Sequence, residues 1–263
     1  MLQGATIQLL KHLRLFLVLF CGLGAHLSTA QNTFYKQFWN EFQFTHPVGQ
    51  AFALELDLGS SFSNTPDERS RLTKFTQFAG MTQLHYFLSA KWKLSLIAAY
   101  FTNSYVPEIG QREYPEFRFS GQGIYYFNKI KNITATRTRI DYRIIENTSG
   151  TFEDVWRYRQ MFKFTKPLNS NYIRAGTFFA FVSEEVFFKT PADVTGPDVF
   201  DRNMLTIGLG YSVTDDLQID IDLTNEFVPR SGGNTINNAV QFNLNLNNPF
   251  GYIERIFHPA TKP

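Results

Sequence analysis

The chain has 263 residues, of which 43% are hydrophobic and 18% charged, and its formal net charge is +2. The small net charge argues against nucleic-acid binding, the hydrophobic fraction argues against disorder, and the single cysteine excludes a disulfide-stapled scaffold. Aromatic residues make up 16%, yet no apolar run approaches the roughly 18 residues of a membrane-spanning helix. This combination favours a protein built of strands.

Residues 1–30 carry the features of an export signal. Lys11 and Arg14 precede the apolar stretch 15–25, and small residues close the segment, so cleavage is expected after Ala30. A short membrane anchor is the alternative, but the apolar stretch is too short to span a bilayer. Removing the segment takes away two basic residues, no acidic residue and the only cysteine, which leaves 23 residues of each charge and no thiol.

Most of the remaining chain alternates apolar and polar residues with a period of two, which indicates strands with one apolar and one polar face. Segment 50–60, for example, sets Leu54 and Leu56 against Glu55 and Asp57. Strands are expected near 33–44, 50–60, 73–87, 92–102, 114–127, 132–146, 152–165, 171–187, 202–213, 217–228 and 236–248.

The connections between these strands alternate in length. Short ones carry turn residues, and longer ones lie near 61–72, 103–113, 188–201 and 229–235. No linker or break in composition interrupts the pattern, so residues 31–263 are expected to form a single domain.

Strand length and aromatic placement favour a membrane barrel over a soluble one. About ten residues cross a ~25 Å apolar band at a rise of ~3.3 Å and a tilt of ~40°, whereas soluble strands average about five or six. Aromatic residues near strand ends on the apolar face are expected to form interfacial girdles, namely Trp92, Tyr100, Tyr125, Phe127, Trp156 and Phe164.

The fold class expected is therefore all-β, an antiparallel up-and-down transmembrane β-barrel of about 10–12 strands. Eleven segments are recognised, although bacterial single-chain barrels usually have an even number, and 251–257 is a candidate twelfth strand. A large secreted β-sandwich is the alternative.

Several short segments resemble an uncharacterised family of bacterial outer-membrane barrels, labelled domain of unknown function 2490. They are 39–44 (WNEFQF), 116–118 (EFR), 139–143 (RIDYR), 157–159 (RYR) and 185–187 (EVF). The resemblance spans most of the chain after residue 30. It implies an outer-membrane location and a barrel fold, and it supplies no activity.

The polar faces of the expected strands separate charges by sign. A basic sector on the fifth to eighth strands, which includes only Glu116 and Asp141 as acids, consists of Arg118, Arg137, Arg139, Arg143, Arg157, Arg159, Lys163 and Arg174. An acidic sector on the first, second and tenth strands consists of Glu41, Glu55, Asp57, Asp220, Asp222 and Glu226. Closure of the barrel is expected to bring the two sectors face to face across the lumen.

Two interpretations of this interior stay open. Opposed charges in a water-filled constriction would favour a narrow pore for small anionic solutes. Alternatively, the same side chains plug the barrel with ion pairs, since side chains nearly fill the interior of a barrel of about ten strands. A third hypothesis, a surface platform or assembly partner, would use the longer loops as contacts.

Enzymatic activity is not expected. An outer-membrane lipid hydrolase would need serine and histidine on neighbouring strands with an orienting polar partner. After residue 30 the chain holds only His46, His85 and His258, and it has no Gly-x-Ser-x-Gly motif. His85, beside Gln83 on a polar face, is interpreted as a lumen histidine with satisfied hydrogen bonds.

No metal or cofactor is expected either, because there is no paired histidine or cysteine spacing. Asp193, Asp198 and Asp201 lack the regular spacing of a calcium loop and are interpreted as solvated. Gly208 and Gly210 are expected to relieve crowding on the lumen face or to allow the strand to bend there. The sequence thus predicts a barrel of the bacterial outer membrane, surrounded by its lipid, with a small anionic solute as candidate cargo.

Overall fold

The computed structural model describes residues 32–65, 72–109, 111–230 and 233–252, so the expected export signal lies outside the described residues. This part of the chain holds one short 3-10 helix, η1 (Pro107–Ile109), and eleven strands. The strands are β1 (Asn32–Val48), β2 (Phe52–Ser63), β3 (Lys74–Phe87), β4 (Trp92–Asn103), β5 (Pro115–Asn128), β6 (Ile133–Glu146), β7 (Phe152–Pro167), β8 (Thr177–Lys189), β9 (Phe200–Ser212), β10 (Leu217–Val228) and β11 (Asn234–Asn247).

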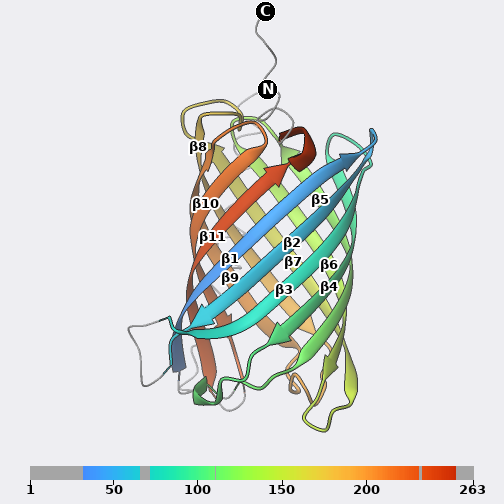
Figure 1. Ribbon diagram of the computed structural model, residues 1–263, viewed down its shortest axis with the longest axis vertical. Helices are drawn as coiled ribbons and strands as arrows, with labels where there is room; N and C mark the ends of the chain where they lie inside the picture. Colours follow the sequence, from blue (N-terminus) through green and yellow to red (C-terminus); the bar gives the residue numbers. More distant parts are fainter. Residues whose placement is uncertain (1–31, 66–71, 110, 231–232, 253–263) are drawn as a thin grey trace, which may run out of the picture.

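The eleven strands form one closed barrel in chain order (Figure 1). Consecutive strands pair antiparallel, as the alternation and short turns predict, and the strand count falls within the predicted range. The closing pair, β1 with β11, is parallel, in register from Asn32 opposite Asn234 to Thr45 opposite Asn247. An odd number of up-and-down strands leaves the first and last pointing the same way, so closure requires a parallel pair.

The start of β8, the end of β1 and the candidate twelfth strand differ from the sequence prediction. β1 continues to Val48 instead of ending near residue 44. β8 begins at Thr177 and not near residue 171, because the preceding residues form a turn in which Gly176 has a φ of +78°. Residues 249–252 form a helical turn, so the candidate strand at 251–257 does not begin as a strand, and its residues from 253 onward lie outside the described part.

The barrel has two unlike ends. The connections that follow β1, β3, β5, β7 and β9 lie at one end, here called the turn end (Figure 1). Those that follow β2, β4, β6, β8 and β10 lie at the other end, the loop end. The connection between β4 and β5, described over 104–109 and 111–114, holds η1 at the loop end. Its Glu108 accepts a 2.7 Å hydrogen bond from Lys74, and this contact holds the pKa of the exposed Glu108 carboxyl below its usual range.

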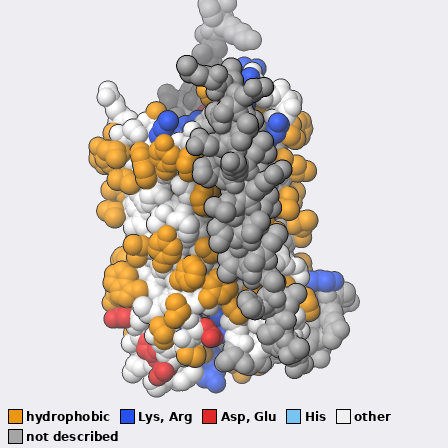
Figure 2. Space-filling view, turned by 180° about the vertical axis from the view of Figure 1, so that it is seen from behind, with side chains coloured by type: hydrophobic (Ala, Val, Ile, Leu, Met, Phe, Trp, Pro, Cys, Tyr) orange, Lys and Arg blue, Asp and Glu red, His pale blue; other side chains and the backbone are white. Residues whose placement is uncertain are grey.

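The barrel wall is apolar outside and polar inside. Leu96 and Leu209 keep 69% and 65% of their surface exposed, whereas Asp141 and Asp57 keep 0% and 1%. Hydrophobic side chains cover the visible wall, and charged ones gather near its two ends (Figure 2). A soluble barrel buries its apolar face inward, so this arrangement is the reverse of what water favours. Among the described residues, no helix is both long and apolar enough to span a membrane.

Two glycines allow rings to pack inside the barrel. Gly208 and Gly210 lie on the inward face of β9, where a Cβ atom would collide with the rings of Phe181 and Phe179 respectively. The two rings, on β8, are buried, and their centroids lie 6.4 Å apart. The prediction that these glycines relieve crowding is confirmed.

Candidate functional site in the barrel interior

The interior is built from inward positions that stand directly opposite one another on neighbouring strands. One row runs from His85 on β3 through Ser95, Gln122 and Arg139 to Arg159 on β7. Because directly opposed Cβ atoms in an antiparallel pair lie about 5 Å apart, such a row forms a continuous band of polar contacts around the wall.

Seven of the eight residues of the predicted basic sector lie in the interior, on β5, β6 and β7: Arg118, Arg137, Arg139, Arg143, Arg157, Arg159 and Lys163. The eighth, Arg174, was wrongly placed there. It is an exposed residue of the turn before β8, and its guanidinium contacts Tyr172, 3.2 Å from the phenol oxygen. The prediction failed because the strand was extended backwards through a turn.

Glu116 at the start of β5 holds two arginines. Arg118 donates to its Oε1 from Nε and Nη2, at 2.9 and 2.7 Å. Arg143 donates to both carboxylate oxygens, at 2.8 Å each. The Arg118 guanidinium also lies 3.9 Å from the centroid of the Phe101 ring. Arg118 and Arg143 are therefore both paired with Glu116 on the same part of the barrel wall.

Asp141 and Glu185 hold the centre of the basic sector. Arg157 donates two hydrogen bonds to Asp141 Oδ2, at 2.9 and 2.8 Å, while Ser120 donates to Oδ1 at 2.7 Å. Glu185 accepts two bonds each from Arg137 and Arg159, all at 2.8–2.9 Å. Charge-assisted bidentate pairs of this kind are short and directional.

Another carboxylate, that of Asp201, lies near the loop end. Asp201 accepts hydrogen bonds from Arg202 at 3.1 Å and from Arg230 at 3.2 Å. Arg202 also donates to Glu226 of the acidic sector at 2.7 Å, and Asp201 lies 3.9 Å from Arg157 of the basic sector. The two sectors are therefore connected through Asp201 and Arg202.

The acids that sequence reasoning missed are Glu185 and Asp201. Glu185 shares the inward face of β8 with buried Phe179, Phe181 and Phe187, so polarity does not identify that face. Asp201 had been assigned to a loop, but a register irregularity between Phe187 and Phe188 accompanies the start of β9, which includes Asp201. The only sequence feature that pointed to Glu185 is the resemblance of segment 185–187 to the barrel family.

The acidic sector is held mainly by amide and hydroxyl groups. Glu55 accepts hydrogen bonds from Thr45 at 2.7 Å and from Gln83 at 2.7 Å. Asn243 donates to both Asp220 and Asp222, at 2.8 and 3.0 Å. The same Gln83 amide reaches Asp57 at 2.5 Å. Lys163, from the basic sector, lies over the ring of Phe181 with its Nζ 4.3 Å from the ring centroid.

Glu41 is the exception in the acidic sector. It is partly exposed on the inward face of β1, and its carboxylate accepts no hydrogen bond from the described residues.

His85 joins a serine and a carboxylate on neighbouring strands. Its Nδ1 lies 2.8 Å from Ser95 Oγ, and its Nε2 lies 3.1 Å from Glu55 Oε2. This is the set of residue types used by serine hydrolases. All three side chains are buried, however, and Ser95 also receives a 3.5 Å contact from Gln122.

A polar cavity of about 400 Å³, here called the vestibule, lies in the interior toward the loop end. Its lining includes Trp39 and Glu41 of β1, Gln77 of β3, Gln241 of β11 and Gln111 of the 104–114 loop. Gln111 is fixed by hydrogen bonds from its amide to the carbonyl oxygens of Thr76 and Ser104, at 2.5 and 3.0 Å. No sequence signal pointed to this cavity.

The six residues predicted to form aromatic girdles all lie on outward positions of the wall: Trp92, Tyr100, Tyr125, Phe127, Trp156 and Phe164. Aromatic rings on the outer wall form pairs near both ends of the barrel. The rings of Trp92 and Tyr125 are 4.9 Å apart near the turn end, and those of Trp156 and Tyr142 are 5.0 Å apart near the loop end.

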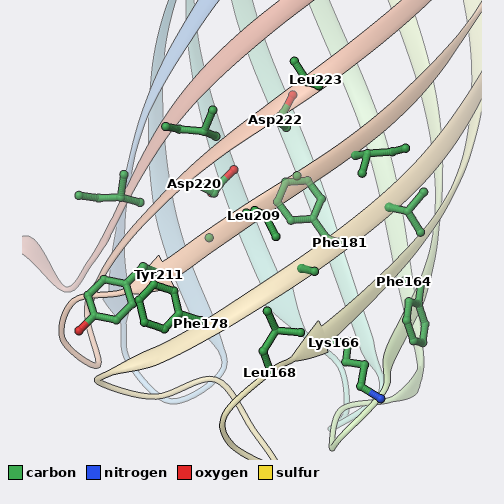
Figure 3. A pocket seen from close by; sticks show the side chains of 17 residues that line it. Phe164, Lys166, Leu168, Phe178, Phe181, Leu209, Tyr211, Asp220, Asp222 and Leu223 are labelled. Carbon is green, nitrogen blue, oxygen red and sulfur yellow. The ribbon is translucent and has the colours of Figure 1, made fainter.

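An apolar hollow of about 1090 Å³ lies on the outer wall over β7 to β10 (Figure 3). Leu209 and Leu223, each 65% exposed, contribute to it, and Phe178 and Tyr211 lie side by side there with ring centroids 4.5 Å apart. Lys166 is the one cation among its lining residues. The described residues contain no group of three or more histidine, cysteine or carboxylate side chains placed to hold a metal ion.

Comparison with solved structures finds a bacterial polysaccharide outer membrane secretin, with a TM-score of 0.50 and 15% sequence identity. The match covers 76% of this chain and 66% of that chain, so this chain spans just under two thirds of the secretin's length. At this identity the likeness shows a shared fold alone. No curated protein matches the chain. A family model, described as protein of unknown function (DUF2490), matches residues 36–237, and the chain therefore belongs to this family.

Proposed function

We propose that the protein is an exported barrel of the bacterial outer membrane whose lumen is closed by its own side chains, so that it does not act as an open diffusion pore. The observation that carries this proposal is the burial of the charged interior. The proposed function combines two predictions from the sequence. One is the outer-membrane location, and the other is a lumen plugged by ion pairs.

The apolar outer wall supports the membrane location. Contiguous apolar patches on water-exposed monomers rarely exceed a few hundred Å². Here exposed leucine, isoleucine or phenylalanine side chains recur on the outward faces of β1 to β10, and Val240 is exposed on β11. The hollow over β7 to β10 is lined almost wholly by apolar atoms. Acyl chains would fill that hollow without the cost of hydrating it.

Burial of the charged interior supports closure. Side chains that line a water-filled channel keep contact with water, whereas Arg157, Asp141 and Glu185 retain 6% or less of their surface. The rings of Phe179 and Phe181 fill the interior nearer the turn end. An anion-selective pore needs unpaired basic groups facing water, and the arginines of the basic sector instead bind carboxylates or, for Arg139, the Gln122 carbonyl at 2.7 Å.

The proposal assigns no reaction to Glu55, His85 and Ser95. A hydrolase must bring an acyl carbonyl within about 3 Å of the serine oxygen. Ser95 keeps 4% of its surface, and the vestibule lining does not include it. The three residues instead contact one another inside the wall, with Ser95 2.8 Å from His85 Nδ1 and Glu55 3.1 Å from His85 Nε2.

Membrane location and closure are tested separately. Outer-membrane fractionation, together with faster gel migration of the unboiled protein, is expected for a closed membrane barrel. Planar-bilayer recordings of the refolded protein are expected to show no stable conductance. Recovery in the soluble periplasmic fraction would contradict the location, and a steady anion-selective conductance would contradict closure.

A further inference from the structure

The vestibule is a cavity to which the function proposed above assigns no role. We propose that it binds a short neutral oligosaccharide, which goes beyond the function proposed above. Its volume of about 400 Å³ falls within the roughly 300–1,000 Å³ of small-molecule sites. In an outer-membrane barrel the longer loops face the cell exterior, so a vestibule at the loop end would meet solutes from outside.

The space for a ligand comes from two small residues. Glu41 on β1 stands opposite Gly59 on β2, which stands opposite Ala79 on β3, and Ala79 stands opposite Phe101 on β4. At the two central positions the wall therefore projects a hydrogen atom and a methyl group. On β5 to β7, by contrast, the inward positions of the basic sector carry arginines, and their side chains fill the lumen. The cavity is thus a consequence of residue size at a fixed register.

The lining offers mainly hydrogen-bond acceptors. The side-chain amides of Gln77 and Gln241 donate to Asn103 and Asn243, each at 2.7 Å. Their carbonyl oxygens receive no hydrogen bond from any residue that the structure describes, and the same holds for the carboxylate of Glu41. Hydroxyl groups of a sugar donate as well as accept, so they complement such a lining.

Trp39 supplies the apolar face that sugar rings pack against. Its indole N–H donates to Gln37 at 2.7 Å, which fixes the ring within the vestibule. In the described part of the chain no other aromatic ring packs on it, whereas Trp92 and Trp156 are packed on tyrosines of the outer wall. An amphipathic ring held rigid by its own N–H is a low-entropy contact surface for a ligand with apolar C–H faces.

The charges of the vestibule disfavour an anion. Arg202, its cation, already donates to Asp201 and to Glu226 at 3.1 and 2.7 Å. Glu41 adds a further carboxylate, which accepts no hydrogen bond from the described residues. The charged oxygens of an anion only accept hydrogen bonds, so they would face acceptors and the carboxylates of Glu41 and Glu226, and burying them there would be costly. A neutral polyhydroxyl ligand avoids both penalties.

Tryptophan fluorescence provides a direct test, because Trp39 is the one inward-facing residue among the chain's three tryptophans. The full chain is refolded in detergent with Trp92→Phe and Trp156→Phe, so that Trp39 is the only emitter. Maltotriose, cellotriose and chitotriose are titrated separately, with inorganic phosphate and putrescine as anionic and cationic probes. At least one trisaccharide is expected to give a saturable change, and neither charged probe is.

The control variants separate binding from folding. Ala79→Leu fills the vestibule and is expected to weaken trisaccharide binding at least tenfold. Ala98→Leu makes the same change on the outward face of β4 and is expected to leave binding unchanged. Faster migration of unboiled protein confirms that each variant folds. The proposal is overturned if no trisaccharide binds saturably, if phosphate or putrescine gives a saturable change, or if folded Ala79→Leu binds a trisaccharide as the parent does.

Discussion

Arg157 on β7 donates two hydrogen bonds to a single carboxylate oxygen of Asp141 on β6, and the strand register places the two residues directly opposite each other. Asp141 is completely buried, and Arg159 adds a second positive charge 4.0 Å from the same oxygen. The pair therefore joins adjacent strands at the centre of the basic sector, and its loss would leave uncompensated charge in the interior.

Asp141→Ala is expected to lower the free energy of unfolding by about 3–5 kcal/mol, because it leaves a buried guanidinium without its main partner. The measurement is a denaturant titration of the refolded barrel. Asp193→Asn, at an exposed loop position, is the matched control and should change stability by less than about 0.5 kcal/mol. A wild-type midpoint for Asp141→Ala would mean that water hydrates the pair and that the lumen is open.

Truncation of one ion-pair cluster is expected to open the lumen. Glu185 with its partners Arg137 and Arg159 forms a unit, so the triple alanine variant removes bulk without leaving one buried charge facing an empty position. Planar-bilayer recordings should show a stable conductance for this variant and none for the wild type. Lys166→Ala on the outer wall should remain silent. A silent triple variant that still shows heat-modifiable migration would place the constriction elsewhere, most simply at Phe179 and Phe181.

Much of the fold follows from the period-two alternation. Ten of the eleven strand segments were predicted to within a few residues, and faces such as that of Glu55 and Asp57 were assigned correctly because each strand separates charge from leucine. β8 breaks this rule: its inward face carries Phe179 and Phe181 beside Glu185. The rings are inside because glycines on β9 make room for them, which is a relation between strands that one strand's pattern cannot reveal.

Features that depend on register could not be predicted from the sequence. The vestibule exists because Gly59 and Ala79 stand level with Glu41, and the contact between His85 and Ser95 exists because these residues are directly opposed. A shift of one residue in either pairing would move the side chains to the other face. Sequence periodicity fixes faces but leaves register to the turns and bulges.

Because the ring of Phe179 packs against Gly210, β9 is expected not to tolerate a larger residue at that position. Gly210→Ala is expected to destabilise the barrel by about 1–3 kcal/mol, because the new methyl group overlaps the Phe179 ring. Phe179→Leu in the same chain should recover part of this loss. Gly121→Ala is the control, since a Cβ there meets no atom within 4 Å. Equal stability of the two glycine variants, by denaturant titration, would contradict the packing.

The outer wall supplies the sharpest test of a membrane environment. Ile207 lies outward near the middle of β9, between Val182 on β8 and Leu223 on β10, and is 58% exposed. In a bilayer, Ile207→Arg near the midplane should cost about 2–4 kcal/mol of folding free energy, because the guanidinium leaves water for hydrocarbon. In a soluble β-sandwich or barrel the same change at so exposed a position would fall within about 0.5 kcal/mol.

The measurement for Ile207→Arg is reversible folding into phospholipid vesicles, with Ile207→Leu as the control for shape. The leucine variant should fold like the wild type. The size of the arginine penalty should also decline toward the ends of the strand, and Tyr211→Arg, nearer the turn end, is expected to cost about 0–1 kcal/mol. Equal costs at the two positions would show that no depth-dependent apolar band surrounds the wall.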